Sequence, residues 1–120
     1  KDGFMLAVER LKSKKEISFV FDKGLSVSSF PIKLFYIKNE GSSRSNVAFT
    51  VGKKKINLAV ERNLIKRRMR ESFRLNCLDG GFFLGHSVVF VCLDKKTASF
   101  DQITKGFQGV LGKFKSFKNK

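Results

Sequence analysis

The residues whose types and spacing could do chemistry are cations in one stretch, 59–76, which reads AVERNLIKRRMRESFRLN. Arg62, Lys66, Arg70 and Arg74 recur there every four residues. On a helix this spacing places the four side chains along one face, where they form a cationic strip. Guanidinium groups bind phosphate oxygens in pairs, so a strip rich in Arg suits a polyanion. We call these four residues the basic ladder and expect them to bind phosphates.

A second series with the same spacing indicates what holds this helix in place. Each of its apolar members lies three residues after a member of the basic ladder: Ile65, Met69, Phe73 and Cys77. The two series therefore run side by side, so that the apolar one can dock on a sheet while the basic ladder stays exposed. Neighbouring like charges destabilise such a helix by a few tenths of a kcal/mol each. Only Glu71, close to Arg67 and Arg68 in the sequence, can reduce this repulsion locally.

The charge of the whole chain agrees with a polyanionic partner. The 120 residues include 25 Lys and Arg against ten Asp and Glu, which gives a formal net charge of +15. Nine basic and two acidic residues lie between positions 53 and 74, so this region carries nearly half of the net charge. Nucleic acid is the usual partner of such a protein, and an anionic membrane surface is the second. A helix face that contacts only solvent is the simplest alternative.

Side chains that could catalyse a reaction are not gathered in this sequence. His86 stands alone and is expected at a turn or a strand edge. The carboxylates are scattered, without the spacing of an acid–base pair or a two-metal site, and no nucleophile elbow is present. Cys77 and Cys92 form no C-x-x-C motif, so we interpret both as small core residues. We expect no catalytic residue and no metal ligand in the chain itself.

The rest of the sequence predicts the elements that position the basic ladder. Capping boxes at Ser13–Glu16 and Ser99–Gln102 mark the starts of two helices, and alternating or continuous apolar runs mark strands. We predict helices at 14–23, 59–76 and from 100 to nearly the end, strands at 30–37, 47–51 and 87–93, and a candidate strand at 25–29. The polar residues 39–46 are interpreted as a hairpin loop, and 87–93 as a strand covered on both faces. This order predicts an α+β domain.

Glycines interrupt the last helix. Gly106, Gly109 and Gly112 each weaken it by about 1 kcal/mol relative to Ala. Close packing of this helix on the sheet is one reason for a chain to keep them, although the sequence alone does not establish it.

The length predicts a single domain over residues 1–120, with a flexible N-terminus at 1–8 and a basic tail at 118–120. The chain begins with Lys1 and not with Met, so we expect that part of the natural N-terminus is missing. No apolar run approaches the roughly 18 residues of a membrane span. We expect a cytoplasmic protein.

The charged helix resembles that of the protein subunit of bacterial ribonuclease P. That family carries an R-N-x-x-K-R-x-x-R motif, which this sequence matches at Arg62, Asn63, Lys66, Arg67 and Arg70. The resemblance extends over about residues 9–118. It implies a small two-layer α/β sandwich in which about three helices pack on a mixed sheet of about four strands. It also implies a left-handed β-α-β crossover around the motif helix.

The resemblance also implies a function. Members of the family help a catalytic RNA to cut precursor tRNA at the 5′ end of the mature sequence. The chemistry belongs to Mg²⁺ held by the RNA, so no cofactor is expected on the protein alone. The expected partners are ribonuclease P RNA and precursor tRNA, with no membrane and no protein partner implied.

The implied site residues fall into two groups. The RNA subunit would be bound by the motif helix and the loop before it: Lys53, Lys54, Lys55, Arg62, Asn63, Lys66, Arg67, Arg68, Arg70 and Arg74. The 5′ leader of the precursor would be bound by Phe21, Lys33 and Phe35, because an aromatic ring beside a cation on an open sheet face can stack single-stranded RNA. Ile17 stands where many members have an aromatic residue, so stacking is expected to be weak there.

Three other functions are compatible with the residues. A structural ribosomal protein would bury the basic helix in ribosomal RNA and have no enzymatic role. A DNA-binding module would place it in the major groove, which leaves the N-terminal helix and the three-lysine loop unexplained. A membrane-surface helix would need the apolar series that the strands are expected to cover.

Overall fold

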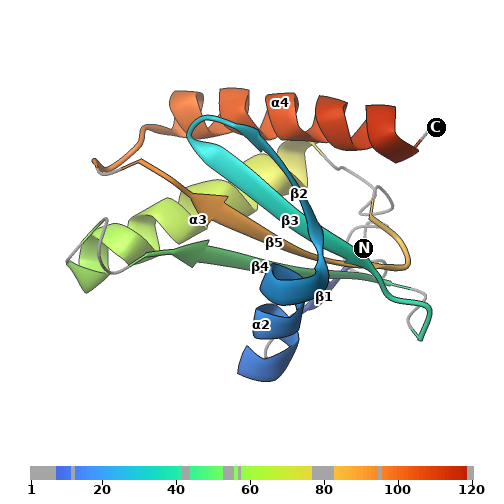
Figure 1. The fold of residues 1–120 in the computed structure, drawn as a ribbon. Coiled ribbons are helices and arrows are strands. Elements are labelled where there is room, and N and C mark those ends of the chain that lie inside the picture. The colour runs from blue at the N-terminus through green and yellow to red at the C-terminus, as the bar shows by residue number, and fades with distance from the viewer. Residues whose placement is uncertain are drawn as a thin grey trace.

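A computed structural model describes residues 8–11, 13–41, 44–52, 56, 58–76, 83–94 and 96–118. Strands and helices follow one another along this part of the chain in a mixed order (Figure 1). They are β1 (Val8–Arg10), α2 (Lys14–Lys23), β2 (Leu25–Ser29), β3 (Ile32–Lys38), β4 (Ser45–Val51), α3 (Ala59–Asn76), β5 (His86–Cys92) and α4 (Phe100–Lys118).

The strands form one mixed sheet with the order β1-β4-β5-β3-β2. β4 is parallel to both β1 and β5, whereas β3 is antiparallel to both β5 and β2. Helices α3 and α4 cover one face of the sheet, and α2 lies on the other (Figure 1). The predicted α+β sandwich is confirmed, with β1 as an additional strand of three residues at the edge.

The predicted helix ends are confirmed by their capping bonds. The Ser13 hydroxyl accepts a hydrogen bond from the Glu16 backbone N–H at 3.4 Å, and the Gly24 N–H closes α2 on the Val20 carbonyl. At the start of α4, Ser99 and Gln102 exchange two bonds, each side chain accepting from the other residue's backbone N–H. Each cap satisfies backbone groups that the helix leaves unpaired at its end.

Two predictions about the strands are wrong. The predicted strand 30–37 begins two residues later, because Phe30 and Pro31 form the turn between β2 and β3. The segment 39–46 is not a hairpin loop, because β5 lies between β3 and β4 and pairs with both. The apolar run of β5 explains this order: a strand that is apolar on both faces is most stable in the interior of a sheet, where helices cover both of its faces.

The connection from β4 through α3 to β5 joins two parallel neighbours in the sheet. In Figure 1 both strands point to the left, β5 lies above β4, and α3 passes behind them. This is the left-handed sense of crossover that the resemblance implies, and it is rare among proteins. The crossover places α3 beside the part of β4 that does not pair with β1.

Phenylalanine fills the core between the sheet and helices α3 and α4. Five rings there are at most 2% exposed: Phe73, Phe83, Phe90, Phe107 and Phe114. The apolar series of α3 is buried among them at Ile65, Met69 and Phe73, as predicted, while Cys77 lies outside the described residues. Cys92 is a buried core residue, and burial raises the pKa of its thiol, which stays protonated at neutral pH.

Two of the three glycines in α4 permit close contact with the sheet side of the molecule. A Cβ atom on Gly109 would overlap the Ser29 Oγ, and one on Gly106 would lie 2.7 Å from Ile32 Cγ1. A Cβ on Gly112 would meet nothing within 4 Å. Close packing therefore explains Gly106 and Gly109, but it does not explain Gly112.

These contacts predict opposite effects for two matched substitutions. Gly109→Ala should lower the free energy of unfolding by about 1–2 kcal/mol, because overpacking exceeds the gain in helix propensity. Gly112→Ala should raise it by up to about 1 kcal/mol, since the helix gains propensity without a clash. Urea unfolding of the two variants measures both values, and a Gly109→Ala protein as stable as Gly112→Ala would contradict the close contact with Ser29.

Candidate nucleic-acid interface

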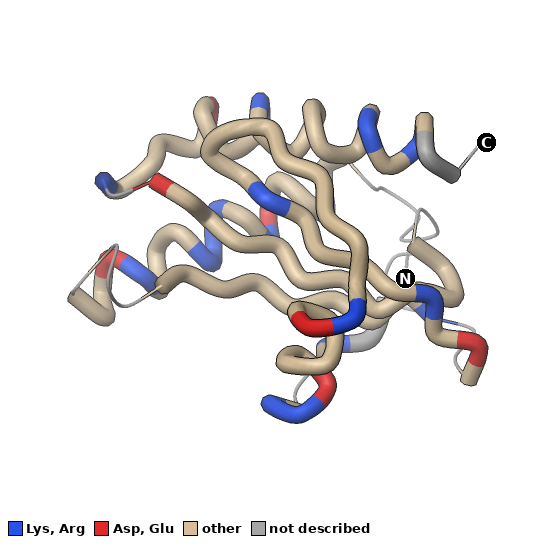
Figure 2. Tube along the Cα trace, viewed as in Figure 1, with Lys and Arg blue, Asp and Glu red and all other residues tan. Residues whose placement is uncertain are grey.

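Helix α3 presents cations along much of its length (Figure 2). Arg67, Arg70, Arg74 and Asn63 are exposed, and Arg62, Lys66 and Arg68 are half-buried. The predicted division of the helix into a buried apolar series and an accessible basic ladder is confirmed at these positions. Lys53, Lys54 and Lys55, predicted to extend the cationic surface before the helix, lie outside the described residues.

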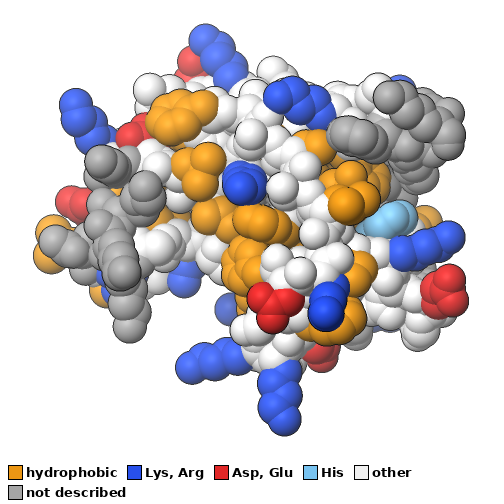
Figure 3. Space-filling view, viewed as in Figure 1, with side chains coloured by type: hydrophobic (Ala, Val, Ile, Leu, Met, Phe, Trp, Pro, Cys, Tyr) orange, Lys and Arg blue, Asp and Glu red, His pale blue; other side chains and the backbone are white. Residues whose placement is uncertain are grey.

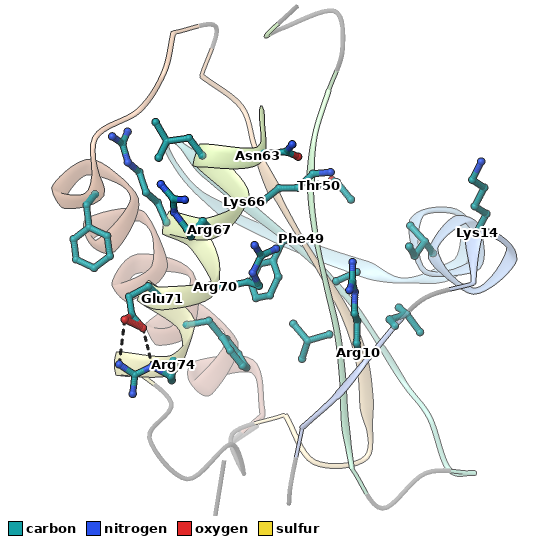
Figure 4. Close-up of a pocket in the computed structure, with 18 residues that line it drawn as sticks. Arg10, Lys14, Phe49, Thr50, Asn63, Lys66, Arg67, Arg70, Glu71 and Arg74 are labelled. Carbon is teal, nitrogen blue, oxygen red and sulfur yellow. Dashed lines mark hydrogen bonds and ion pairs between the residues drawn. The ribbon is translucent and has the colours of Figure 1, made fainter. Parts of the chain in front are cut away.

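A groove runs between α3 and the edge of the sheet. One wall comes from α3, the floor includes Ala48, Phe49 and Thr50 of β4, and Arg10 and Lys14 stand on the opposite side. Figure 4 shows Asn63, Lys66 and Arg70 projecting from the α3 side and Arg10 and Lys14 lying across from them. Cations on both walls above a partly apolar floor can hold a phosphodiester chain and cover its sugars or bases.

Arg10, Lys14 and Thr50 line the groove but were not predicted as site residues from the sequence. Arg10 reaches the groove because β1 pairs with β4 in parallel, with Arg10 opposite Val47. A strand of three residues carries too little pattern to be recognised, so no local signal could have found this cation. Lys14 and Thr50 belong to predicted elements, but only the arrangement of the sheet shows which groove they line.

Two of the predicted phosphate ligands are hydrogen-bonded to backbone of this chain. The Arg62 Nη1 donates to the Ile56 carbonyl at 2.9 Å, and the Arg68 Nη1 donates to the Ala98 carbonyl at 2.5 Å. Arg62 thereby ties α3 to Ile56, and Arg68 ties α3 to the segment just before α4. Since a guanidinium has five N–H donors, the bond to Ala98 leaves Arg68 donors for a phosphate, and both bonds restrict how far the two side chains can move.

The partner of Glu71 within α3 differs from the prediction. Glu71 is hydrogen-bonded to Arg74 through both carboxylate oxygens, at 2.7 and 3.1 Å, and no such bond joins it to Arg67 or Arg68 among the described interactions. The hydrogen bond from Arg74 lowers the pKa of Glu71, so the carboxyl is ionised at neutral pH. A member of the basic ladder is therefore partly neutralised before any RNA binds.

Glu71→Gln should remove the charge that partly neutralises Arg74 and should strengthen binding of an RNA partner. We expect about a fivefold gain in affinity near 0.15 M salt and a salt slope steeper by about one unit, as expected for one additional phosphate contact. Asp101→Asn is the matched control, because Asp101 pairs with Lys105 on α4 at 3.3 Å and does not line the groove. Equal effects of the two substitutions on affinity would mean that only net charge matters.

The three residues implied for leader binding lie together on the α2 face of the sheet. The Phe21 and Phe35 rings meet edge to face with centroids 4.8 Å apart, and the Lys33 Nζ lies 5.0 Å from the centroid of the Phe35 ring. Figure 3 shows hydrophobic side chains gathered over the strands beside α2, with cationic side chains among them. Phe21 is the more exposed ring, so it offers a base the freer stacking surface, whereas the Phe35 ring already has Lys33 above it.

Other chemistry finds little support within the described residues. His86 begins β5, contacts the Leu84 carbonyl through Nδ1 and meets the Phe114 ring edge to face, as expected for a strand-edge histidine. In the part of the chain that the structure describes, no three His, Cys, Asp or Glu side chains gather where they could hold a metal ion. Nor is any helix in that part long and apolar enough to cross a membrane.

Comparisons with known proteins agree with this architecture. A family model described as Ribonuclease P matches residues 5–115. The ribonuclease P protein component of Alkaliphilus metalliredigens is 30% identical over 112 residues, which cover 92% of this chain and 97% of that protein. The one from Caldanaerobacter subterraneus is 32% identical over 112 residues, which cover 92% of this chain and 93% of that protein.

Solved structures show the same relationship. The Staphylococcus aureus RNase P protein superposes with a TM-score of 0.73 at 25% identity, covering 86% of this chain and 92% of that one. The Thermotoga maritima protein gives a TM-score of 0.71 at 25% identity, covering 88% and 96%. The family model spans most of the chain, and these relatives match it along nearly their whole length, which supports none of the three other functions considered above. The chain therefore belongs to the ribonuclease P protein family.

Proposed function

We propose that this chain is the protein subunit of a ribonuclease P, an endoribonuclease that matures the 5′ end of tRNA in the cytoplasm. It binds the catalytic RNA through the groove beside α3 and the 5′ leader of precursor tRNA through the α2 face of the sheet. The observation that carries this proposal is the groove itself, whose two walls bear Lys66 and Arg70 on one side and Arg10 and Lys14 on the other.

The role of the protein in this proposal is electrostatic and positional. Lys and Arg on both walls neutralise phosphates of a folded RNA, which reduces the need for free cations to hold the same fold. Such a lining repels divalent cations, so the proposal assigns the Mg²⁺ ions implied by the family to the RNA subunit. When bound there, Mg²⁺ supplies the activated water and stabilises the leaving oxygen.

Reconstitution tests the proposal directly. The full chain is mixed with a bacterial ribonuclease P RNA at low magnesium, and cleavage of a precursor tRNA is followed. We expect cleavage well above that of RNA alone, with a 5′-mature tRNA as product. A variant with Arg67 and Arg70 replaced by Ala is the matched control and should give much less stimulation. No stimulation by the unaltered protein would reject the proposal.

The proposed binding of the 5′ leader can be tested separately. Phe21→Ala should weaken binding of a precursor tRNA to the assembled enzyme by about tenfold, because stacking on an aromatic ring contributes about 1–3 kcal/mol per base. Binding of mature tRNA, which has no leader, should be unchanged. Phe19→Ala is the control, since Phe19 is an exposed ring on the same helix without a described contact to Phe35. Equal losses for both substitutions would contradict the assigned platform.

A further inference from the structure

An aromatic ring stands at the α4 end of the groove, where neither the motif nor the family resemblance places a site. Phe100 is the first residue of α4, and 39% of it is exposed. It lines the same groove as Leu64, Arg67 and Arg68 of α3. An exposed aromatic ring beside arginines, in a chain of this charge, has the composition of a stacking surface for a nucleic-acid base.

The backbone that carries Phe100 is fixed by three independent contacts. Arg68 donates to the Ala98 carbonyl two residues before the ring, and the Thr97 hydroxyl donates to the Glu61 carboxylate at 3.2 Å. The reciprocal Ser99–Gln102 cap then sets the direction of the first turn of α4. The ring is therefore presented from a rigid position, which limits the conformational entropy lost when a base stacks on it.

We propose that Phe100 is a second stacking position, which takes an unpaired base of the RNA subunit on the α4 flank of α3. This inference rests on the proposed function and extends it, because neither the leader platform on the α2 face nor the basic ladder of α3 includes Phe100. Leu64, which lines the same groove, supplies apolar surface. Arg67 is exposed and supplies the cation for the neighbouring phosphate.

Charge favours RNA over a protein partner as the occupant. Glu71 also lines the groove, but both of its carboxylate oxygens are bonded to Arg74. Arg67 and Arg68 therefore keep the surface around the ring positive. A purely apolar partner would leave these guanidinium groups desolvated without a counter-charge, which is costly.

The chain contains no Trp, so one introduced Trp reports on this position alone. Phe100→Trp is titrated with ribonuclease P RNA in the full chain, and Phe30→Trp is the matched control. Phe30 is a 69% exposed ring on the β2–β3 turn and does not line the groove. We expect strong fluorescence quenching by a stacked base at position 100 and little at position 30. Equal quenching at both positions, or none at position 100, overturns the proposal.

Affinity provides a second readout. Phe100→Leu keeps apolar bulk but removes the aromatic face, and should weaken RNA binding by about tenfold with an unchanged salt slope, because stacking releases no counterions. Phe100→Trp should bind as tightly as the unaltered chain. If the unaltered chain binds RNA with a slope that depends on Arg67 while Phe100→Leu has no effect, only this inference fails. If the unaltered chain does not bind the RNA, the proposed function itself fails.

Discussion

Replacing Lys66, Arg67 and Arg70 together with Ala should weaken binding of ribonuclease P RNA by about 100-fold near 0.15 M salt and flatten the salt slope by about three units. Each of these cations lines the groove, and none of them has a described hydrogen bond to the chain's own backbone, unlike Arg62 and Arg68. Their contribution therefore comes mainly from phosphate neutralisation and counterion release. Filter binding over a series of salt concentrations measures the affinity and the slope in one experiment.

The control variant must lose the same number of positive charges at positions outside the groove. Lys38, Lys105 and Lys115 are exposed residues of β3 and α4 that do not line the groove. Replacing these three with Ala should change the slope by less than about one unit, because the cations lie outside the proposed contact surface. A control that weakens binding as strongly as the groove variant would show that the RNA responds to net charge and not to this surface. The stability of the groove variant should be unchanged or slightly higher, since like charges on α3 repel one another.

The helices were predictable because their signals are local. The bounds of α3 and both capping boxes follow from residue spacing within a few turns of chain, and the structure confirms them. The division of α3 into buried and accessible residues is equally local, since it depends only on helical periodicity. This is why the sequence identified the basic ladder and the residues that anchor it.

What the sequence could not supply depends on contacts between distant segments. The insertion of β5 between β3 and β4 is decided by burial on both faces, which no single segment specifies. Arg10 joins the groove only through this strand order, and Arg68 could not be distinguished from Arg67 until the Ala98 carbonyl was placed beside it. Several Arg residues lie within reach of Glu71 along the helix. Their spacing in the sequence does not show which of them pairs with Glu71, whereas the side-chain geometry shows that Arg74 does.

Phe73→Ala should be the most destabilising of these substitutions. Its effect concerns RNA binding as well as stability, because Phe73 belongs to the helix that carries the groove cations. The Phe73 ring packs between Phe49, Phe83 and Phe90, with centroids 5.6 to 6.2 Å away, and anchors α3 to the sheet. Removing such a buried ring costs about 3–5 kcal/mol, a large part of the roughly 5–15 kcal/mol by which a domain is stable. Leu75→Ala, at an exposed position on the same helix, should cost less than about 0.5 kcal/mol.

The RNA should restore part of what Phe73→Ala removes. The substitution leaves every groove cation in place, so the folded variant can still bind, and a ligand that binds only the folded state adds about 2.7 kcal/mol at 100 times its dissociation constant. Thermal unfolding with and without ribonuclease P RNA measures this recovery, which should be lost when Lys66, Arg67 and Arg70 are also replaced. A Phe73→Ala protein that RNA cannot stabilise, although it still folds, would mean that the position of α3 on the sheet matters more for binding than its charges.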